Sequence, residues 1–224
     1  MSHAQPVPPS SDTIRRALAE FKVAVTDVQI EQIQRYMAML IKWNDAMNLT
    51  AIHDPLEILY RHFCESMFGA SFLPVGNGRL ADVGSGGGFP GLPLKIARPE
   101  LEVCLIDSNV KKATFLAEVV RELALPSARV LVSRYEELDE EIAPLDVACS
   151  RALGEFSQFL GWAASERIGA RTVMLWIGGR DLDEVRGSKD WNWQEPVAVP
   201  QSLRRFVLIG SRAEQSVVDD AGAD

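Results

Sequence analysis

The sequence contains the stretch Asp82-Val83-Gly84-Ser85-Gly86-Gly87-Gly88-Phe89-Pro90-Gly91, with an apolar run before it and a helical pattern after it. The run over residues 79–83 predicts a short strand, and the pattern over residues 91–96 predicts a helix. Glycine has no Cβ atom, so a turn made of glycines lets the backbone approach a bound ligand closely. A glycine-rich turn between a strand and a helix is therefore predicted to bind a nucleotide-like ligand, the alternative being a purely structural turn.

Two ligand classes use turns of this kind. Residues 86–91 match the G-x-G-x-x-G pattern of dinucleotide-binding proteins, whereas residues 82–88 match D-x-G-x-G-x-G, the first motif of class I methyltransferases. The dinucleotide pattern begins directly after its strand, but here Gly84 and Ser85 would stand in between. In the methyltransferase pattern the strand runs through Asp82-Val83 and Gly84 starts the turn. The spacing favours S-adenosylmethionine as the cofactor and leaves NAD as the alternative.

An acidic residue follows the next predicted strand, residues 101–106. Asp107 stands 23 residues after Gly84, where a carboxylate can accept hydrogen bonds from both ribose hydroxyls. Asp107-Ser108 could instead cap the helix predicted over residues 110–123. The glycine turn at this distance favours ribose binding by Asp107.

Strands and helices alternate through the remainder of the chain. Strands are predicted at residues 79–83, 101–106, 128–132, 145–149, 172–177, 191–199 and 204–209. Helices are predicted at residues 91–96, 110–123, 156–164 and 181–186. This alternation predicts a doubly wound, mostly parallel α/β sheet of seven strands, the Rossmann-like fold of class I methyltransferases.

The N-terminal third reads as helix instead. Apolar residues recur at helical spacing over residues 14–25 and 30–41, and a further helical pattern covers residues 56–72. We therefore expect a mobile N-terminus (1–11), a helical extension (12–72), a methyltransferase domain (73–210) and a mobile acidic tail (211–224).

Composition limits the classes of protein that the chain can represent. The 224 residues are 47% hydrophobic, which argues against global disorder, and carry a formal net charge of −8. That charge argues against coating nucleic acid by bulk charge but allows a local basic face. The three cysteines form no even set, which favours a reducing, cytoplasmic compartment. We expect neither a signal peptide nor a membrane span.

Motifs beyond the glycine turn resemble one family, the bacterial small-subunit (16S) rRNA guanine-N7 methyltransferases called RsmG or GidB. The resemblance covers roughly residues 40–209. It rests on the following segments: Trp43-Asn44, Asn48-Leu49-Thr50-Ala51-Ile52, Asp54-Pro55, Arg61-His62-Phe63, the glycine turn extended to Pro93, Asp107-Ser108 with Lys111-Lys112, Ser133-Arg134-Tyr135-Glu136-Glu137-Leu138, and Asp146-Val147 with Ser150-Arg151. It implies methyl transfer from S-adenosylmethionine to N7 of a guanine in 16S rRNA. The resemblance also implies that the protein is a monomer. Its RNA substrate would be either free RNA or part of a ribosomal particle.

The resemblance, together with the turn and strand spacing, gives a set of candidate site residues. The cofactor candidates are Gly84, Gly86, Phe89, Asp107, Ser108, Tyr135, Glu136 and Arg151. The candidates for positioning RNA or the target base are Arg134, Arg151, Arg180, Arg205 and His62. These arginines follow or flank predicted strands, so we expect them to gather at the edge of the sheet where the parallel strands end.

The chain departs from the family pattern at three places. Trp176-Ile177-Gly178 stands where the family has Leu-Lys-Gly, and Arg180 is the nearest base that could replace the lysine. Glu65 stands where the family has aspartate, and Tyr135 where it has a small residue.

The chemistry of guanine N7 agrees with what the motifs lack. N7 carries a free lone pair, so the reaction needs alignment and a suitable field rather than a general base. Cys149, at the end of a predicted strand, is expected to be a buried cysteine rather than a nucleophile. His62 and Cys64 have no companion pair at zinc-site spacing, so we expect no metal. A small-molecule methyltransferase, an NAD-dependent enzyme of similar fold and a non-catalytic adenosine-binding module remain alternatives.

Overall fold

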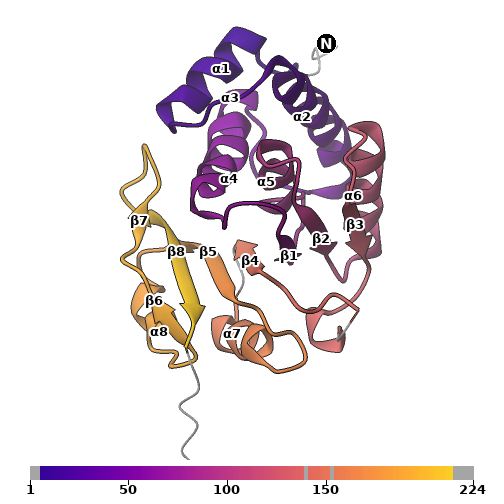
Figure 1. Ribbon diagram of the computed structural model, residues 1–224. Helices are drawn as coiled ribbons and strands as arrows, with labels where there is room; N and C mark the ends of the chain where they lie inside the picture. Colours follow the sequence, from indigo (N-terminus) through magenta and orange to yellow (C-terminus); the bar gives the residue numbers. More distant parts are fainter. Residues whose placement is uncertain (1–5, 139–140, 152–153, 214–224) are drawn as a thin grey trace, which may run out of the picture.

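The computed structural model describes residues 6–138, 141–151 and 154–213 and has a central sheet with helices on both faces (Figure 1). The strands are β1 (Arg79–Val83), β2 (Glu102–Ile106), β3 (Ala128–Leu131), β4 (Val147–Arg151), β5 (Thr172–Gly178), β6 (Trp191–Trp193), β7 (Val197–Ala198) and β8 (Arg205–Arg212). Their order is β3-β2-β1-β4-β5-β8-β6, with β7 also paired to β8. The doubly wound α/β fold is thereby confirmed.

The helical segments fall into two groups along the chain. Before the sheet come α1 (Ser11–Glu20), α2 (Asp27–Met47), α3 (Pro55–Ile58), the π-helical η1 (Leu59–Cys64), α4 (Glu65–Phe68) and the 3₁₀ turn η2 (Gly69–Phe72). Between the strands come α5 (Gly91–Ala97), α6 (Val110–Glu122), the 3₁₀ turn η3 (Tyr135–Glu137), α7 (Phe156–Ala164) and α8 (Leu182–Arg186).

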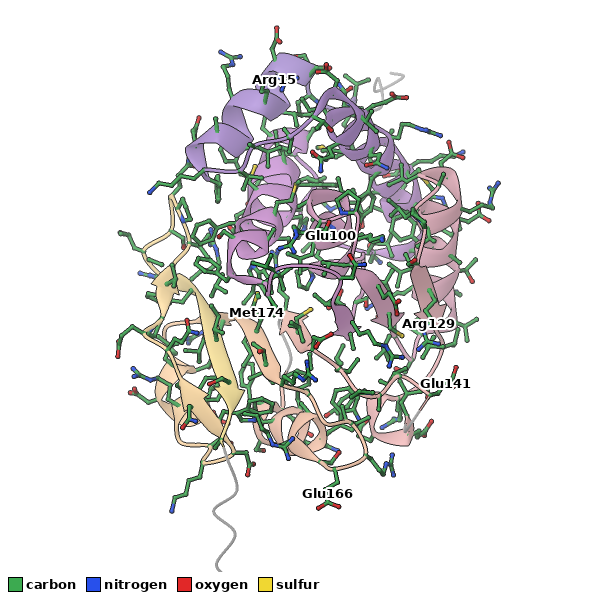
Figure 2. The ribbon with its side chains drawn as sticks, in the orientation of Figure 1. Arg15, Glu100, Arg129, Glu141, Glu166 and Met174 are labelled. Atoms are coloured by element: carbon green, nitrogen blue, oxygen red, sulfur yellow. The ribbon has the colours of Figure 1, made fainter. Side chains whose placement is uncertain are left out.

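The sheet separates two hydrophobic cores because successive strand residues point to opposite faces. Leu80 packs on the face covered by α1, α2, α4, α5 and α6, whereas Ala81 packs on the face covered by α7 and α8. Met174 of β5 is fully buried in the first core, while Arg15 and Glu166 reach into solvent at the periphery (Figure 2). The helical extension is thus part of the main core.

The strand register brings several chain segments to one edge. β1, β2, β4 and β5 are parallel, with Val83 opposite Ile106 and Arg151 opposite Trp176. β8 runs antiparallel to β5, so that its first residue, Arg205, lies opposite Gly178. The carboxyl ends of the parallel strands and the start of β8 therefore meet at the same edge, where ligands bind in this class of fold.

Several boundaries differ from the prediction. The strand predicted over residues 191–199 is two short strands, β6 and β7, interrupted near Pro196, whose ring nitrogen cannot donate a ladder hydrogen bond. Over the residues that the structure describes, the sheet therefore has eight strands rather than seven. Helix and strand also extend to Ser11 and Arg212, inside the segments predicted as mobile. Residues 1–5 and 214–224 of those segments lie outside the described residues.

The helix predicted over residues 56–72 is instead a succession of short helical types. α3 is followed by the π-helical turn η1, then by α4 and the 3₁₀ turn η2. A π-helical turn widens the helix locally and is often found at functional sites. Here it carries Arg61 and His62.

Candidate cofactor and substrate site

The turn after β1 is fixed by buried polar contacts. The Ser85 hydroxyl donates to the carbonyl oxygen of Asp82 (2.9 Å) and accepts the N–H of Ile106 (3.1 Å). The Asp82 carboxylate accepts the N–H of Gly91 at 2.8 Å. Burial raises the pKa of Asp82 to about 7, against the lowering effect of the Gly91 hydrogen bond. The shape of the turn is therefore held by contacts within the protein.

Glycine is required in this turn for two reasons. Gly84, Gly86 and Gly88 have φ of +71°, +58° and +95°, values that side chains with a Cβ atom rarely adopt. At Gly88 a Cβ atom would also lie 2.3 Å from the Tyr36 hydroxyl, whereas at Gly86 the nearest atom would be 3.8 Å away. A Cβ atom at Gly88 would thus collide with the protein, whereas a Cβ atom at Gly86 would not.

Tyr36 of α2 holds the turn from the helical side. Its hydroxyl donates to the carbonyl oxygen of Gly87, and its ring stacks on Phe89 with centroids 5.5 Å apart and planes 10° apart. Tyr36 is fully buried. No sequence motif indicates this role, because Tyr36 lies in an ordinary apolar helix pattern.

Asp107 meets the turn from β2. One carboxylate oxygen accepts the N–H of Gly86 and the other the N–H of Asn109, both at 2.8 Å. The helix α6 is capped by Asn109, whose side chain accepts from the N–H groups of Lys111 and Lys112. The interpretation of Asp107-Ser108 as the helix cap is therefore wrong, and Asp107 faces the glycine turn instead.

A cleft of about 290 Å³ opens beside this contact. It is lined by Gly84, Ile106, Asp107, Ser108, Ser133, Arg134, Tyr135 and Glu136. Five of the cofactor candidates (Gly84, Asp107, Ser108, Tyr135, Glu136) are thus brought together at one place. Gly86 borders it through its hydrogen bond to Asp107, while Phe89 and Arg151 are not among the lining residues.

Phe89 instead links the turn to His62. The two rings stack with centroids 4.6 Å apart and planes 18° apart. His62 Nε2 lies 2.7 Å from Thr50 Oγ1, and His62 Nδ1 lies 3.2 Å from Arg151 Nη2. A guanidinium can only donate, so Nδ1 accepts and Nε2 carries the proton, which it donates to Thr50. Burial, together with the charges of Arg151 and Arg61, lowers the pKa of His62 to about 3.

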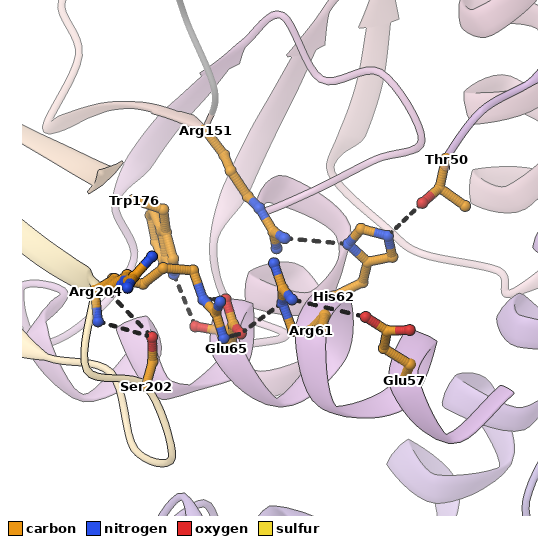
Figure 3. A network of polar contacts seen from close by, with 10 residues as sticks. Thr50, Glu57, Arg61, His62, Glu65, Arg151, Trp176, Ser202 and Arg204 are labelled. Carbon is orange, nitrogen blue, oxygen red and sulfur yellow. Dashed lines mark hydrogen bonds and ion pairs between the residues drawn. The ribbon is translucent and has the colours of Figure 1, made fainter. Parts of the chain in front are cut away.

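The arginines predicted to gather at this edge do so only in part. Arg205 and Arg61 share the Glu65 carboxylate, and Arg151, which is bonded to His62, lies beside Arg61 (Figure 3). Arg134 lines the cofactor cleft, and Arg180 is exposed after β5, outside the network. Ile177, which stands at the position of the family lysine, is buried in the second core.

Cys149 is fully buried and offers no accessible nucleophile. Its thiol donates to the Asp82 carboxylate at 3.9 Å. Burial and the nearby Asp82 charge raise the pKa of Cys149 well above its usual range. Within residues 6–138, 141–151 and 154–213 there is no cluster of three or more potential metal-binding side chains. The helices of the same ranges include none with the length and apolar character of a membrane span.

Comparisons with known proteins agree with this arrangement. Residues 29–206 match the GidB family model, described as rRNA small subunit methyltransferase G. A relative from Dichelobacter nodosus named ribosomal RNA small subunit methyltransferase G is 36% identical over 193 residues, covering 85% of this chain and 90% of the relative. A relative of the same name from Chromobacterium violaceum is 44% identical over 149 residues, covering 66% of this chain and 69% of the relative.

Solved structures share the fold at much lower identity. Magnesium protoporphyrin IX methyltransferase from Synechocystis PCC 6803, solved with bound S-adenosylmethionine, has a TM-score of 0.58 at 10% identity and covers 80% of this chain and 97% of its own. A methyltransferase dependent on S-adenosylmethionine from Aquifex aeolicus has a TM-score of 0.57 at 17% identity and covers 79% of this chain and 98% of its own. Both show the class I methyltransferase fold.

Proposed function

The chain belongs to the family of ribosomal RNA small subunit methyltransferase G, and from this premise we propose that the atom it methylates is N7 of a guanine. The enzyme transfers a methyl group from S-adenosylmethionine to small-subunit ribosomal RNA. The choice of N7 is supported by the geometry at the sheet edge.

The residues of the cleft fit S-adenosylmethionine. Each oxygen of Asp107 accepts one backbone N–H and keeps a lone pair for a ribose hydroxyl. Gly84 and Gly86 present bare backbone, and Tyr135 and Glu136 offer a ring and an acceptor on the β3 side for an adenine. When bound, the cofactor would supply its methyl group as an electrophilic sulfonium. We assign Gly84, Gly86, Asp107, Ser108, Tyr135 and Glu136 to its binding.

The observation that carries the choice of N7 is the state of His62. Both ring nitrogens are engaged, and the low pKa makes the imidazole a poor proton acceptor. An exocyclic amine or a ribose hydroxyl must lose a proton during methylation, whereas N7 attacks with a lone pair that is already free. An edge that offers guanidinium groups rather than a base suits N7. A guanidinium can also hold guanine O6 while N7 stays free.

Arg134 and Arg180 are the proposed RNA contacts at the rim of this site. Both are exposed at the carboxyl ends of parallel strands, after β3 and β5 respectively. A guanidinium at such a place can bind a phosphate in two-point fashion. Arg180→Ala is therefore expected to reduce RNA methylation without changing the affinity for the cofactor.

Nucleoside mapping tests the proposed atom. Small-subunit rRNA from cells with and without the protein is digested and its modified nucleosides are located by mass spectrometry. We expect one 7-methylguanosine to be missing without the protein and to return when the gene is restored, but not with an Asp107→Ala copy. A missing methyl group on an exocyclic amine, a ribose or a pyrimidine would contradict N7 while leaving the family assignment intact.

A further inference from the structure

Glu65 is a nearly buried carboxylate that two arginines share. Arg205 binds both carboxylate oxygens in a forked contact. Its Nη2 lies 2.7 Å from Oε1 and its Nε lies 3.1 Å from Oε2. Arg61 Nε lies 3.4 Å from Oε1, outside hydrogen-bond geometry. The indole N–H of Trp176 donates to the backbone oxygen of Glu65 at 2.7 Å, which ties this helical turn to β5. Glu65 thereby fixes arginines from two distant parts of the chain.

A third guanidinium lies beside this pair without an acid of its own. Arg151 Nη2 donates to the neutral His62, and its Nη1 is buried with no hydrogen-bond partner in the part of the chain that the structure describes. Arg61 and Arg151 point toward one another (Figure 3). Even with the half-exposed Glu57, 3.7 Å from Arg61, guanidiniums outnumber carboxylates here.

Buried donors without acceptors are unfavourable, so this arrangement is incomplete without an anion. The fork to Glu65 uses two of the five N–H groups of Arg205 and leaves three for a ligand. Burial lowers the pKa of Arg151, an effect that an anionic ligand would reverse. The cluster therefore has both the free donors and the excess positive charge that bind a phosphate or a carboxylate.

The position of the cluster identifies which anion it receives. The cofactor cleft lies at the ends of β1, β2 and β3, whereas these arginines come from η1, β4 and β8. β4, which carries Arg151, pairs with β1, but in the sheet order β8 lies three strands beyond β1, a distance of about 14 Å. The side chains of Arg61 and Arg205 are 38% and 32% exposed, so the cluster is open to a polymer. An RNA phosphate fits this place better than the carboxylate of the cofactor.

We propose that Arg61, Arg151 and Arg205 bind one phosphate group of the RNA strand beside the target nucleotide, with Glu65 as the positioning residue that holds Arg61 and Arg205. This inference rests on the proposed function only in that RNA is the substrate, and it does not depend on which atom of the base is methylated. Phosphate contacts fix the register of a nucleic acid on a protein without reading its sequence. The cluster would thus set where the target base sits relative to the cofactor.

The decisive variant is Glu65→Gln. Its KM should change in one direction if Glu65 acts through its charge and in the other if Glu65 positions the two arginines. Loss of the carboxylate makes the cluster more positive, so a role of charge alone would lower the KM for small ribosomal subunits. A positioning role raises that KM, by about tenfold for one lost charge-assisted hydrogen bond, while kcat stays within about twofold. Glu65→Asp keeps the charge and is expected to lie between the parent and Glu65→Gln.

Two further variants keep the test decisive if Glu65→Gln does not fold. Arg205→Lys keeps the charge but loses the fork, and is expected to raise the same KM in the same direction. Arg61→Ala is expected to reduce the slope of log KM against log salt by about 0.7, the value for one phosphate of a single strand. The matched control is Glu122→Gln, which removes the acidic partner of Arg35 in an exposed pair between α2 and α6 (2.6 Å) and should leave KM unchanged.

Cofactor affinity, measured by titration calorimetry, separates the outcomes. The proposal requires that Arg61→Ala and Arg205→Lys bind S-adenosylmethionine within about twofold of the parent. An equal loss of cofactor and RNA affinity would assign the anion to the cofactor carboxylate and overturn the proposal. So would a parental KM and salt slope in both variants. A parent enzyme that methylates small-subunit RNA at an atom other than N7 would instead refute the proposed function and leave this proposal standing, a result visible before any variant is made.

Discussion

The hydroxyl of Tyr36 donates a hydrogen bond to the carbonyl oxygen of Gly87, so a helix of the N-terminal extension touches the cofactor turn directly. The same ring stacks on Phe89, which in turn stacks on His62. The extension therefore helps to shape the glycine turn that we assign to the cofactor, and it does more than cover the sheet.

Tyr36→Phe tests this contact. The variant keeps the stacked ring but leaves the Gly87 carbonyl without its buried donor, so we expect a loss of about 1 kcal/mol in the free energy of unfolding and weaker binding of S-adenosylmethionine. Denaturant unfolding and calorimetry measure the two effects. Tyr60→Phe is the matched control, because it removes a tyrosine hydroxyl whose partner is Glu20, away from the turn. Cofactor affinity equal to that of the parent would mean that the turn holds its shape without Tyr36.

Alanine substitutions at Gly86 and Gly88 should separate folding from binding. Both residues have positive φ, which costs a residue with a Cβ atom about 1–2 kcal/mol. At Gly88 the new methyl would also collide with the Tyr36 hydroxyl, whereas at Gly86 it meets no protein atom closer than 3.8 Å. We expect Gly88→Ala to lower the melting temperature markedly. Gly86→Ala should lower it less and yet lose cofactor affinity, because its methyl would occupy the open space that we assign to the cofactor. The reverse order would show that the turn is placed wrongly against the cofactor.

Asp107→Ala should weaken the binding of S-adenosylmethionine by about 1.5–3 kcal/mol, the range for hydrogen bonds to a charged group. The variant also removes the acceptor of the Gly86 N–H. Asp107→Asn is therefore measured beside it, since the amide oxygen can still accept one backbone hydrogen bond. Calorimetry with S-adenosylmethionine gives the affinities, and circular dichroism checks the fold. Unchanged affinity in both folded variants would show that Asp107 does not bind the ribose of the cofactor.

His62 should make the fold sensitive to acid. Its pKa in the folded protein is about 3, below the ordinary value of 6.5, so the unfolded chain binds the proton more tightly. The stability that a neutral His62 supports is complete above pH 6.5 and is lost as the pH falls toward 3. We compare the free energy of unfolding of His62→Gln with that of the parent. Between pH 7.5 and pH 4.5 the difference should shift by about 1–3 kcal/mol in favour of the variant.

Comparing variant and parent at the same pH removes the contribution of Asp82. The pKa of Asp82 is raised to about 7, so its contribution runs the other way and is lost as the pH rises. The rate of methyl transfer should show no acid limb from His62 between about pH 6 and 9. A limb that disappears in His62→Gln would revive His62 as a base.

Local spacing was enough to predict the glycine turn, most of the strands and the position of Asp107 beside that turn. Their signals are short-range: a strand, a turn and a helix follow one another within 20 residues. Arg205 was also expected at the edge where the parallel strands end, and the antiparallel direction of β8 places it there.

The contacts that the sequence could not predict are those between distant residues. Glu65 appeared only as a replacement for aspartate, yet it binds Arg205 across 140 residues and Trp176 across 111. Arg180 was expected to join the other arginines, but the turn after β5 leaves it exposed and apart. Side-chain pairing of this kind depends on the packed helix and sheet, which no local pattern encodes.

The last strand to be synthesised, β8, supplies Arg205 to the network. The residues lining the cleft assigned to the cofactor fall between Gly84 and Glu136, so all of them leave the ribosome before Arg205. Until β8 is added between β5 and β6, Glu65 lacks its forked partner. A nascent chain therefore contains all the residues proposed to bind the cofactor before the arginine cluster proposed to bind RNA is complete. Proteolysis of the nascent or unfolded β8 would then yield a product that still contains the cofactor residues but lacks Arg205.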